Sequence, residues 1–292
     1  MASQVLDKAR AYTNVLEKYT EKKLISSVLD SANSDIVAFR EGGIVEVPHI
    51  ETTALGNYDR AKGYPEGASS VKIDQLQLEY DRGREFNVDA VDDMDTMYAR
   101  STGLMKSFIN EYVTPEIDGT RFMKYAKGAL QKANGELTKD TVKGAINAAY
   151  DSLFQSNAAN DKLYLFVNAK VKGLLEDSLN RVTLNGDGNI SQIINMYNDM
   201  QVITVPNVRF TADMKVNASG FTPGSNQINF LLVAPSAVRQ IKKHEVIRTF
   251  RPEVNQDMDA WKFQYRIHHD AWVLPGRSAG VYAHTATEVS PA

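Results

Sequence analysis

The chain has 292 residues, with 33 lysines and arginines against 36 aspartates and glutamates, and 43% of its residues are hydrophobic. This apolar fraction excludes a disordered chain, and the net charge of −3 gives no global field for nucleic acid or anionic lipid. The sequence has no cysteine, which excludes disulfides, thiolate metal sites and cysteine nucleophiles. We therefore expect a globular protein of two lobes or one elaborated domain.

The amino terminus shows no targeting or membrane signal. It lacks a basic stretch followed by an apolar run, and no segment approaches the ~20 apolar residues of a membrane span. We expect a protein that is made in the cytoplasm and has no membrane partner.

Residues 3–31 open the chain with an amphipathic helical pattern. Ser3 is a suitable N-cap, and the apolar face comprises Val5, Ala9, Tyr12, Leu16 and Tyr19. Such a terminal helix packs either on its own domain or on a neighbouring subunit. The sequence leaves both open, and Tyr12, Leu16 and Tyr19 are candidate interface residues for the second alternative.

Two β-like runs follow, at residues 44–47 and 71–80. The segment 54–70 between them is rich in glycine and polar residues, so we expect a long exposed loop that joins a two-stranded ribbon. Such a ribbon is marginally stable alone and needs a surface to lie on. The candidate contact residues at its tip are Tyr58, Arg60, Lys62 and Glu66.

Helical patterns dominate the next part of the chain. An apolar stripe from Met94 to Tyr125 predicts a long helix, which Pro115 should kink or interrupt. A second helix should follow Gly135, with Thr138 as its cap and Val142 on its buried side.

The second half of the chain alternates between strand and helix patterns. We expect a strand at 163–167, helices at 169–179 and 190–200, and strands at 202–205 and 228–233. A short helix should run from Pro235 to Lys243, before β-like runs at 261–267 and 271–274. This half therefore has an α/β pattern, and we expect an α+β fold for the chain as a whole.

Two clusters of polar residues have the composition of metal sites. The acidic group Asp89, Asp92, Asp93 and Asp95 lacks the glycine and the glutamate that a calcium loop requires, so acids at a helix start are the simpler interpretation. His268 and His269 are adjacent, and neighbouring side chains of a strand point to opposite faces, so they should not share a metal ion. We therefore expect no metal site and no cofactor.

The densest basic stretch comprises Lys242, Lys243, His244, Arg248 and Arg251. It could contact phosphate, but no interleaved aromatic residues form a stacking platform, so a solvated helix end is the simpler interpretation. The sequence also lacks the familiar motifs of hydrolases, zinc proteases and nucleotide-binding enzymes, and we expect no catalytic residues.

Four segments resemble the major capsid proteins of tailed bacteriophages, of the kind found in phages of Gram-positive bacteria. Residues 111–122 look like the end of the spine helix of that family, and residues 198–206 look like a segment of its A domain. Residues 230–238, running on to Lys242 and Lys243, and residues 268–274 are further matches. The resemblance covers most of the chain in the family's order.

The resemblance implies the HK97-type fold. Residues 1–40 would be the N-terminal arm and 41–88 the E-loop ribbon. Residues 89–160, with part of 261–292, would form the P domain with its spine helix, and 161–260 the A domain. Some relatives crosslink an E-loop lysine to a neighbour's asparagine; Lys62 is available here, but no partner is assigned.

The implied function is a self-assembling shell of hexamers and pentamers that encloses double-stranded DNA. The expected location is the virion, after assembly in the host bacterial cytoplasm. The expected partners are further copies of the chain, a separate scaffolding protein, a portal, a cement protein and the packaged DNA. Because the arm helix begins almost at Met1, either the chain is already processed or the scaffold is a separate protein.

Two other functions remain open on the sequence. An encapsulin, the shell of a bacterial protein compartment, shares the implied fold. A cytoplasmic enzyme that uses His268, His269 or Asp270 is the alternative from a different class, and it predicts a small soluble oligomer.

Overall fold

The computed structural model describes residues 24–30, 38–39, 41–61, 63–91, 99–156, 162–178 and 195–289. Most of the terminal helix expected at residues 3–31, with Tyr12, Leu16 and Tyr19, lies outside these residues. So do Lys62 and the acidic residues Asp92, Asp93 and Asp95. In the described part of the expected terminal helix, Ile25–Leu29 form a 3-10 turn rather than an α-helix.

A six-stranded sheet forms the core of the larger lobe. Its strand order is β5-β14-β11-β6-β8-β7, and the strands are Gln131–Asn134, Val281–Thr285, Ile228–Val233, Tyr164–Asn168, Met200–Val205 and Met196–Tyr197. Helices α5 (Lys139–Gln155) and α6 (Ala169–Ser178) pack against each other and against this sheet. The central strands β6 and β11 are almost wholly buried, as their continuous apolar sequences predict.

Thr138 caps α5, as predicted. Its side chain and that of Thr141 form a reciprocal capping box, which satisfies backbone groups that the helix start would otherwise leave unpaired. Val142 and Ile146 of α5 are fully buried in the core of this lobe.

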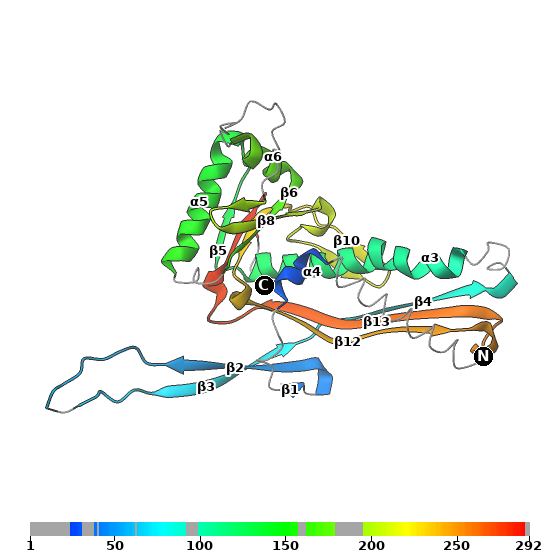
Figure 1. The fold of residues 1–292 in the computed structure, drawn as a ribbon, viewed down its shortest axis with the longest axis horizontal. Coiled ribbons are helices and arrows are strands. Elements are labelled where there is room, and N and C mark those ends of the chain that lie inside the picture. The colour runs from blue at the N-terminus through cyan, green and yellow to red at the C-terminus, as the bar shows by residue number, and fades with distance from the viewer. Residues whose placement is uncertain are drawn as a thin grey trace, which may run out of the picture.

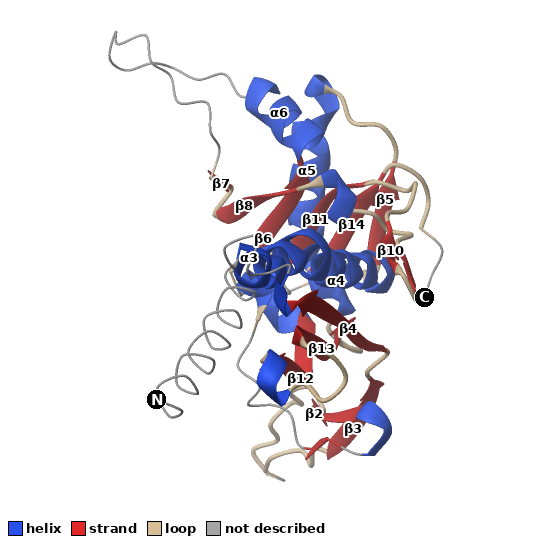
Figure 2. Ribbon diagram, turned by 90° about the vertical axis from the view of Figure 1, so that its right-hand side faces the viewer, coloured by secondary structure: helices blue, strands red, loops and turns tan. Residues whose placement is uncertain are grey.

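A long helix runs along a three-stranded sheet beneath this lobe (Figures 1 and 2). The helix comprises α3 (Ala99–Phe108), a π-helical turn (Ile109–Val113) and α4 (Thr114–Gly128). The sheet has the order β12-β13-β4, from Val238–Phe250, Ala260–Val273 and Tyr80–Asp89. A second core cluster lies between helix and sheet and includes Met105, Ile109, Phe263 and Ile267.

Pro115 does not break the long helix. It occupies the first turn of α4, directly after the π turn. The wider hydrogen-bond pattern there tolerates the absence of a backbone N–H donor at proline. The expected interruption is therefore a local π turn within a continuous helix.

A hairpin projects from the body of the molecule (Figure 1). Strands β2 (Ile44–Thr52) and β3 (Ser69–Gln77) pair over nine residues, and β1 (Ala38–Phe39) joins the edge of β2. We call residues 44–77 the ribbon and the rest of the described chain the body. The β-like run predicted at 71–80 is divided between two strands, because β3 ends at Gln77 and β4 begins at Tyr80. β4 begins in the range expected for the ribbon, but it pairs with β13 of the body.

One predicted helix is wrong, and the described end of a second is not helical. Pro235–Ala237 form one 3-10 turn, and β12 follows as a strand because Val238–Phe250 pairs along almost its whole length with β13. The basic residues Lys242, Lys243, His244 and Arg248 therefore lie on a strand rather than at a helix end. Tyr197 and Met200 close a two-residue hairpin in which Asn198 and Asp199 have positive φ, so the predicted helix 190–200 does not extend through 196–200.

The predicted β runs 261–267 and 271–274 are one strand, β13, because pairing with β12 and β4 carries it through His268–Asp270. A small hairpin of β9 (Lys215–Asn217) and β10 (Gly220–Thr222) lies beside the long helix. Short 3-10 turns complete the described chain, at Ile25–Leu29, Glu41–Gly43, Asn207–Arg209, Pro252–Val254 and Ser278–Gly280. Within the described ranges, no helix is both long and apolar enough to cross a membrane.

Candidate assembly interface

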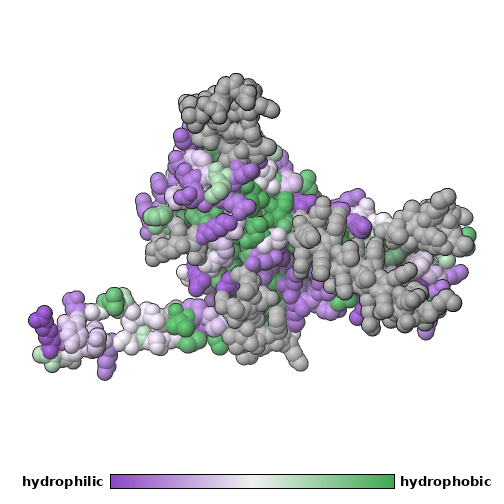
Figure 3. All heavy atoms as spheres, in the orientation of Figure 1, coloured by the Kyte–Doolittle hydropathy of each residue, from purple (hydrophilic) through white to green (hydrophobic). Residues whose placement is uncertain are grey.

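One face of the ribbon exposes apolar side chains. Ile50 pairs with Val71, and Pro48 pairs with Ile73, so these residues share a face. The exposed fractions of Ile50, Val71 and Ile73 are 69%, 66% and 52%. Figure 3 shows hydrophobic surface at intervals along the ribbon. A row of exposed β-branched residues on a projecting hairpin is typical of a contact surface.

The other face of the ribbon is used near the body. Val45 and Val47 are buried there against Leu78, Ile241 and Leu274. One face therefore holds the base of the ribbon on the body, and the outer part of the other face, at Ile50, Val71 and Ile73, is not covered by the described residues.

The ribbon tip is exposed, and three of the four residues predicted there are described. Tyr58, Arg60 and Glu66 are all exposed, and Arg60 and Glu66 form no ion pair with the rest of the described chain. The Tyr58 and Tyr64 rings meet edge to face at 5.0 Å, beside a tight turn in which Gly63 has a φ of +85°. Contact of these residues with a neighbour remains a prediction.

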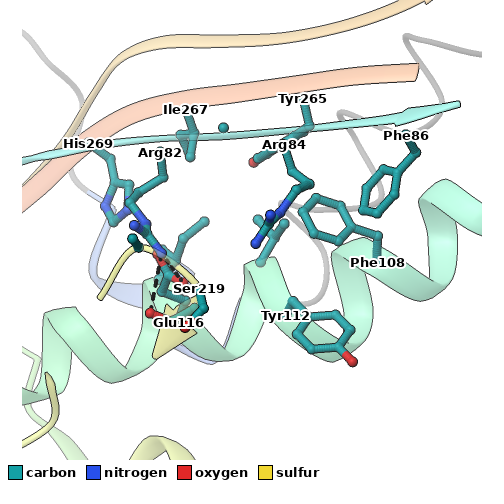
Figure 4. A pocket seen from close by; sticks show the side chains of 15 residues that line it. Arg82, Arg84, Phe86, Phe108, Tyr112, Glu116, Ser219, Tyr265, Ile267 and His269 are labelled. Atoms are coloured by element: carbon teal, nitrogen blue, oxygen red, sulfur yellow. Dashed lines mark hydrogen bonds and ion pairs between the residues drawn. The ribbon is translucent and has the colours of Figure 1, made fainter. Parts of the chain in front are cut away.

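A cleft of about 300 Å³ separates β4 from the long helix (Figure 4). At one end, the Phe86 ring packs edge to face on Phe108 at 4.9 Å. At the other, Arg82 Nε lies 2.6 Å from Glu116 Oε1, and Arg82 Nη2 donates to the Gly220 carbonyl at 3.3 Å. Arg84 also lines this cleft, and it has no acidic partner among the described residues. The sequence analysis missed this site, although the alternation of Arg82, Arg84 and Phe86 on β4 was a possible signal.

A buried carboxylate attaches residues 24–30 to the long helix. Asp118 is fully buried and accepts hydrogen bonds from the Ile25 and Ser26 N–H groups and the Ser26 hydroxyl, at 2.7–3.1 Å. Arg209 Nη1 lies 3.2 Å from the same carboxylate and supplies the opposite charge. Residues 24–30, which belong to the expected N-terminal arm, are therefore fixed on α4 of the same chain.

The two adjacent histidines face opposite sides of β13, as predicted. His268 is half-buried, whereas His269 is buried and stacks on Tyr80 at 5.7 Å. Burial, with smaller effects from Arg121 and Lys124, lowers the pKa of His269 to about 3. Within the described ranges, no group of three histidines and acids is arranged to hold a metal ion.

Asp270 is committed to an internal ion pair. Its carboxylate is 1% exposed and lies 2.7 Å from Lys124 Nζ. Burial raises the pKa of Asp270, and Lys124 and two backbone N–H groups oppose that rise. These contacts give Asp270 a structural role.

Neither a protein-family model nor a curated protein sequence matches the chain. Solved structures do match it over nearly its full length. A chain from Mycobacterium phage Che8 has a TM-score of 0.61 at 15% identity, over 90% of each chain. A chain of the mature capsid of bacteriophage PhiM1 has a TM-score of 0.56 at 13% identity, over 87% of this chain and 85% of the phage chain.

The chain has the HK97-type capsid fold. A virus-like particle from Pyrococcus furiosus also shares it, with a TM-score of 0.53 at 13% identity over 95% of this chain and 99% of the particle's chain. At these identities the likeness establishes the fold, and the predicted α+β class is confirmed.

Proposed function

We propose that this chain is the major capsid protein of a tailed phage, a structural subunit whose copies assemble into a closed shell around double-stranded DNA. The observation that carries the proposal is the ribbon, which exposes Ile50, Val71 and Ile73 on one face and has no part of the described body to cover them. Contact with a second copy would bury these side chains. The role is structural and requires no catalytic residue.

The fold neighbours support this role, because the PhiM1 chain comes from a mature capsid and another similar chain, at a TM-score of 0.59 and 12% identity, comes from a cyanophage capsid. We assign residues 41–88 to the E-loop, 89–160 with part of 261–292 to the P domain, and 161–260 to the A domain. Strand pairing adds that β4 and β12, whose residues fall in the ranges for the E-loop and the A domain, both join the sheet of β13.

The proposed shell consists of hexamers and pentamers, and its location is the virion. A separate scaffolding protein, a portal and a cement protein are proposed partners, with assembly in the cytoplasm of the host bacterium. Contact with the packaged DNA would be weak and non-specific, because the net charge of the chain is −3.

Ile73→Asp tests the role of the ribbon in assembly. The side chain is half exposed, so the free energy of unfolding of the isolated subunit should change by less than about 0.5 kcal/mol. Assembly should be lost, because an unpaired carboxylate would be buried at the contact. Electron microscopy across a salt and concentration series measures shells, tubes and capsomers, and urea unfolding measures stability.

The matched control is Ile73→Leu, which keeps an apolar side chain at the same position and should assemble. If Ile73→Asp forms normal shells, the ribbon is not the contact surface. If the parent protein stays monomeric at every condition, even with a scaffold supplied, the capsid proposal fails.

The shell of a protein compartment remains the second candidate, because the virus-like particle from Pyrococcus furiosus shares the fold. The contents of particles isolated from the native source discriminate between the two. Nuclease-protected double-stranded DNA supports a phage capsid, whereas an enclosed enzyme supports a compartment.

A further inference from the structure

A connection of two residues joins one strand of the ribbon to the body. β3 ends at Gln77 and β4 begins at Tyr80, so Leu78 and Glu79 carry the chain between two sheets. The Leu78 N–H donates to the Gly43 carbonyl at 2.9 Å. The Glu79 N–H donates to Asp270 Oδ2 at 3.0 Å. Both amides of the connection are therefore held.

Asp270 takes the place of a main-chain partner at this point. The pairing of β4 with β13 ends where Tyr80 lies opposite His269, and Glu79 is the first residue beyond it. The N–H of a departing strand needs an acceptor, and here that acceptor is a side-chain carboxylate. A hydrogen bond to a charged group is stronger than one to a neutral carbonyl, so the direction of departure is well defined.

Lys124 of the long helix holds Asp270 in place. Its Nζ lies 2.7 Å from Asp270 Oδ1 and 2.9 Å from Glu79 Oε2. The same ammonium lies 5.0 Å from the centre of the Tyr80 ring and 5.9 Å from that of Trp272. One cation therefore joins the long helix, β13, β4 and the ribbon connection.

The other strand of the ribbon enters through two glycines. Gly42 and Gly43 have φ values of +83° and +81°, a region that residues with side chains rarely adopt. A Cβ atom at Gly43 would also approach the His268 ring to 3.1 Å. The path of this strand is therefore fixed by its backbone, and that of its partner by Asp270.

Small rotations at this connection produce large displacements at the tip. The tip is about 15 residues from Leu78, or about 45–50 Å of extended strand. A rotation of about 5° would move the tip by about 4 Å, enough to lose van der Waals contact with a fixed neighbour.

We propose that Asp270, held by Lys124, is a latch that sets the angle at which the ribbon leaves the body, and through it the curvature at which subunits meet. The second half of this inference rests on the proposed function. Asp270 and Lys124 are positioning residues, since neither lies on the exposed face of the ribbon.

The latch can be tested in the free subunit. Because the chain has no cysteine, Arg60→Cys at the tip and Asp151→Cys on α5 create two unique sites for spin labels. Asp270→Asn should broaden the distance distribution between the labels and speed amide exchange at Glu79 on the order of tenfold to hundredfold, the range for a lost charged hydrogen bond. Lys124→Gln should act in the same direction, and Lys124→Arg should restore the parental distribution.

Asp81→Asn is the matched control. This substitution removes an exposed carboxylate of β4 whose Oδ2 lies 2.6 Å from Arg266 Nη2. The ion pair lies within the body, two residues from the connection. The label distances should not change in this variant. If Asp270→Asn and Lys124→Gln both fold, by near-ultraviolet circular dichroism, and keep the parental distances, the latch is refuted.

Particle size tests the second half of the inference. The parent should give one narrow diameter distribution by electron microscopy, and Asp270→Asn should give mixed diameters or open sheets. Parental diameters in Asp270→Asn refute control of curvature. A parent that forms no particle contradicts the proposed function instead, and the label distances still decide whether the latch exists.

Discussion

The six-stranded lobe and the ribbon differ in how far the chain itself buries their apolar side chains. In the lobe, β6 and β11 are covered on both faces, and Phe166, Leu231 and Leu232 are fully buried within the chain. In the ribbon, Ile50, Val71 and Ile73 are exposed by half or more. The lobe thus completes its own core, whereas the described residues leave one face of the ribbon without apolar cover.

This difference predicts that stability and assembly respond to different substitutions. Apolar area buried within the chain contributes to the free energy of unfolding, and area buried between chains contributes to assembly. Substitutions in the core of the lobe should therefore unfold the subunit, and substitutions on the exposed face of the ribbon should leave it folded.

Phe122→Ala should have the largest effect on unfolding. The ring is fully buried on α4, and its centre lies 5.1 Å from that of the Phe166 ring and 5.3 Å from that of the Phe210 ring. Removing it leaves a cavity, and the free energy of unfolding should fall by about 3–5 kcal/mol. Urea unfolding measures the change, and a loss below about 1 kcal/mol would contradict a tightly packed core.

His269 should make the body sensitive to acid. Its pKa falls from an ordinary 6.5 to about 3 in the folded chain, so below pH 6.5 the unfolded state binds a proton that the folded state does not. Stability should therefore decrease from pH 6.5 towards pH 3, by roughly 3–5 kcal/mol. His269→Phe keeps a ring against Tyr80 and should flatten this part of the curve.

The difference between the pH–stability curves of the parent and of His269→Phe reports the titration of His269 alone. The raised pKa of Asp270 acts with the opposite sign, since its folded form binds the proton more readily, but Asp270 is common to both proteins. Parallel curves of unfolding free energy against pH would show that His269 does not titrate as proposed.

Tyr64→Ser should have the smallest effect on unfolding. The side chain is 87% exposed at the ribbon tip and contacts Tyr58, so the free energy of unfolding should change by less than about 0.5 kcal/mol. Thermal disassembly of shells should still shift to lower temperature if the tip contacts a neighbour. A variant that unfolds more readily, with shells of parental stability, would place the tip in the subunit's own core.

Local patterns predicted those elements whose causes lie close together in the sequence. The Thr138 cap needs Thr141, three residues away, and the central strand β11 has a continuous apolar run. The ribbon was predicted because its two runs flank a loop with little apolar material. The expected exposure of Tyr58, Arg60 and Glu66 follows from the same observation.

Local patterns do not predict elements whose structure depends on pairing with distant strands. Residues 238–243 have no strong strand pattern, and β12 forms because β13, beginning at Ala260, pairs with it. The Arg82–Glu116 pair joins residues 34 apart, and the bond from Glu79 to Asp270 spans 191 positions. No local pattern contains these contacts, so the cleft and the connection emerged only from the folded chain.

Among the described residues, the strand order β1-β2-β3 leaves β3 as an edge strand. Its unpaired N–H and C=O groups, next to exposed Val71 and Ile73, could template pairing with any other extended chain. β3 carries charges of both signs, at Lys72 and Asp74. Charged side chains on an edge strand commonly disfavour such pairing. In the newly synthesised subunit, ordered assembly should therefore compete with aggregation through this edge. The solubility of the subunit before assembly should depend on the charges of Lys72 and Asp74.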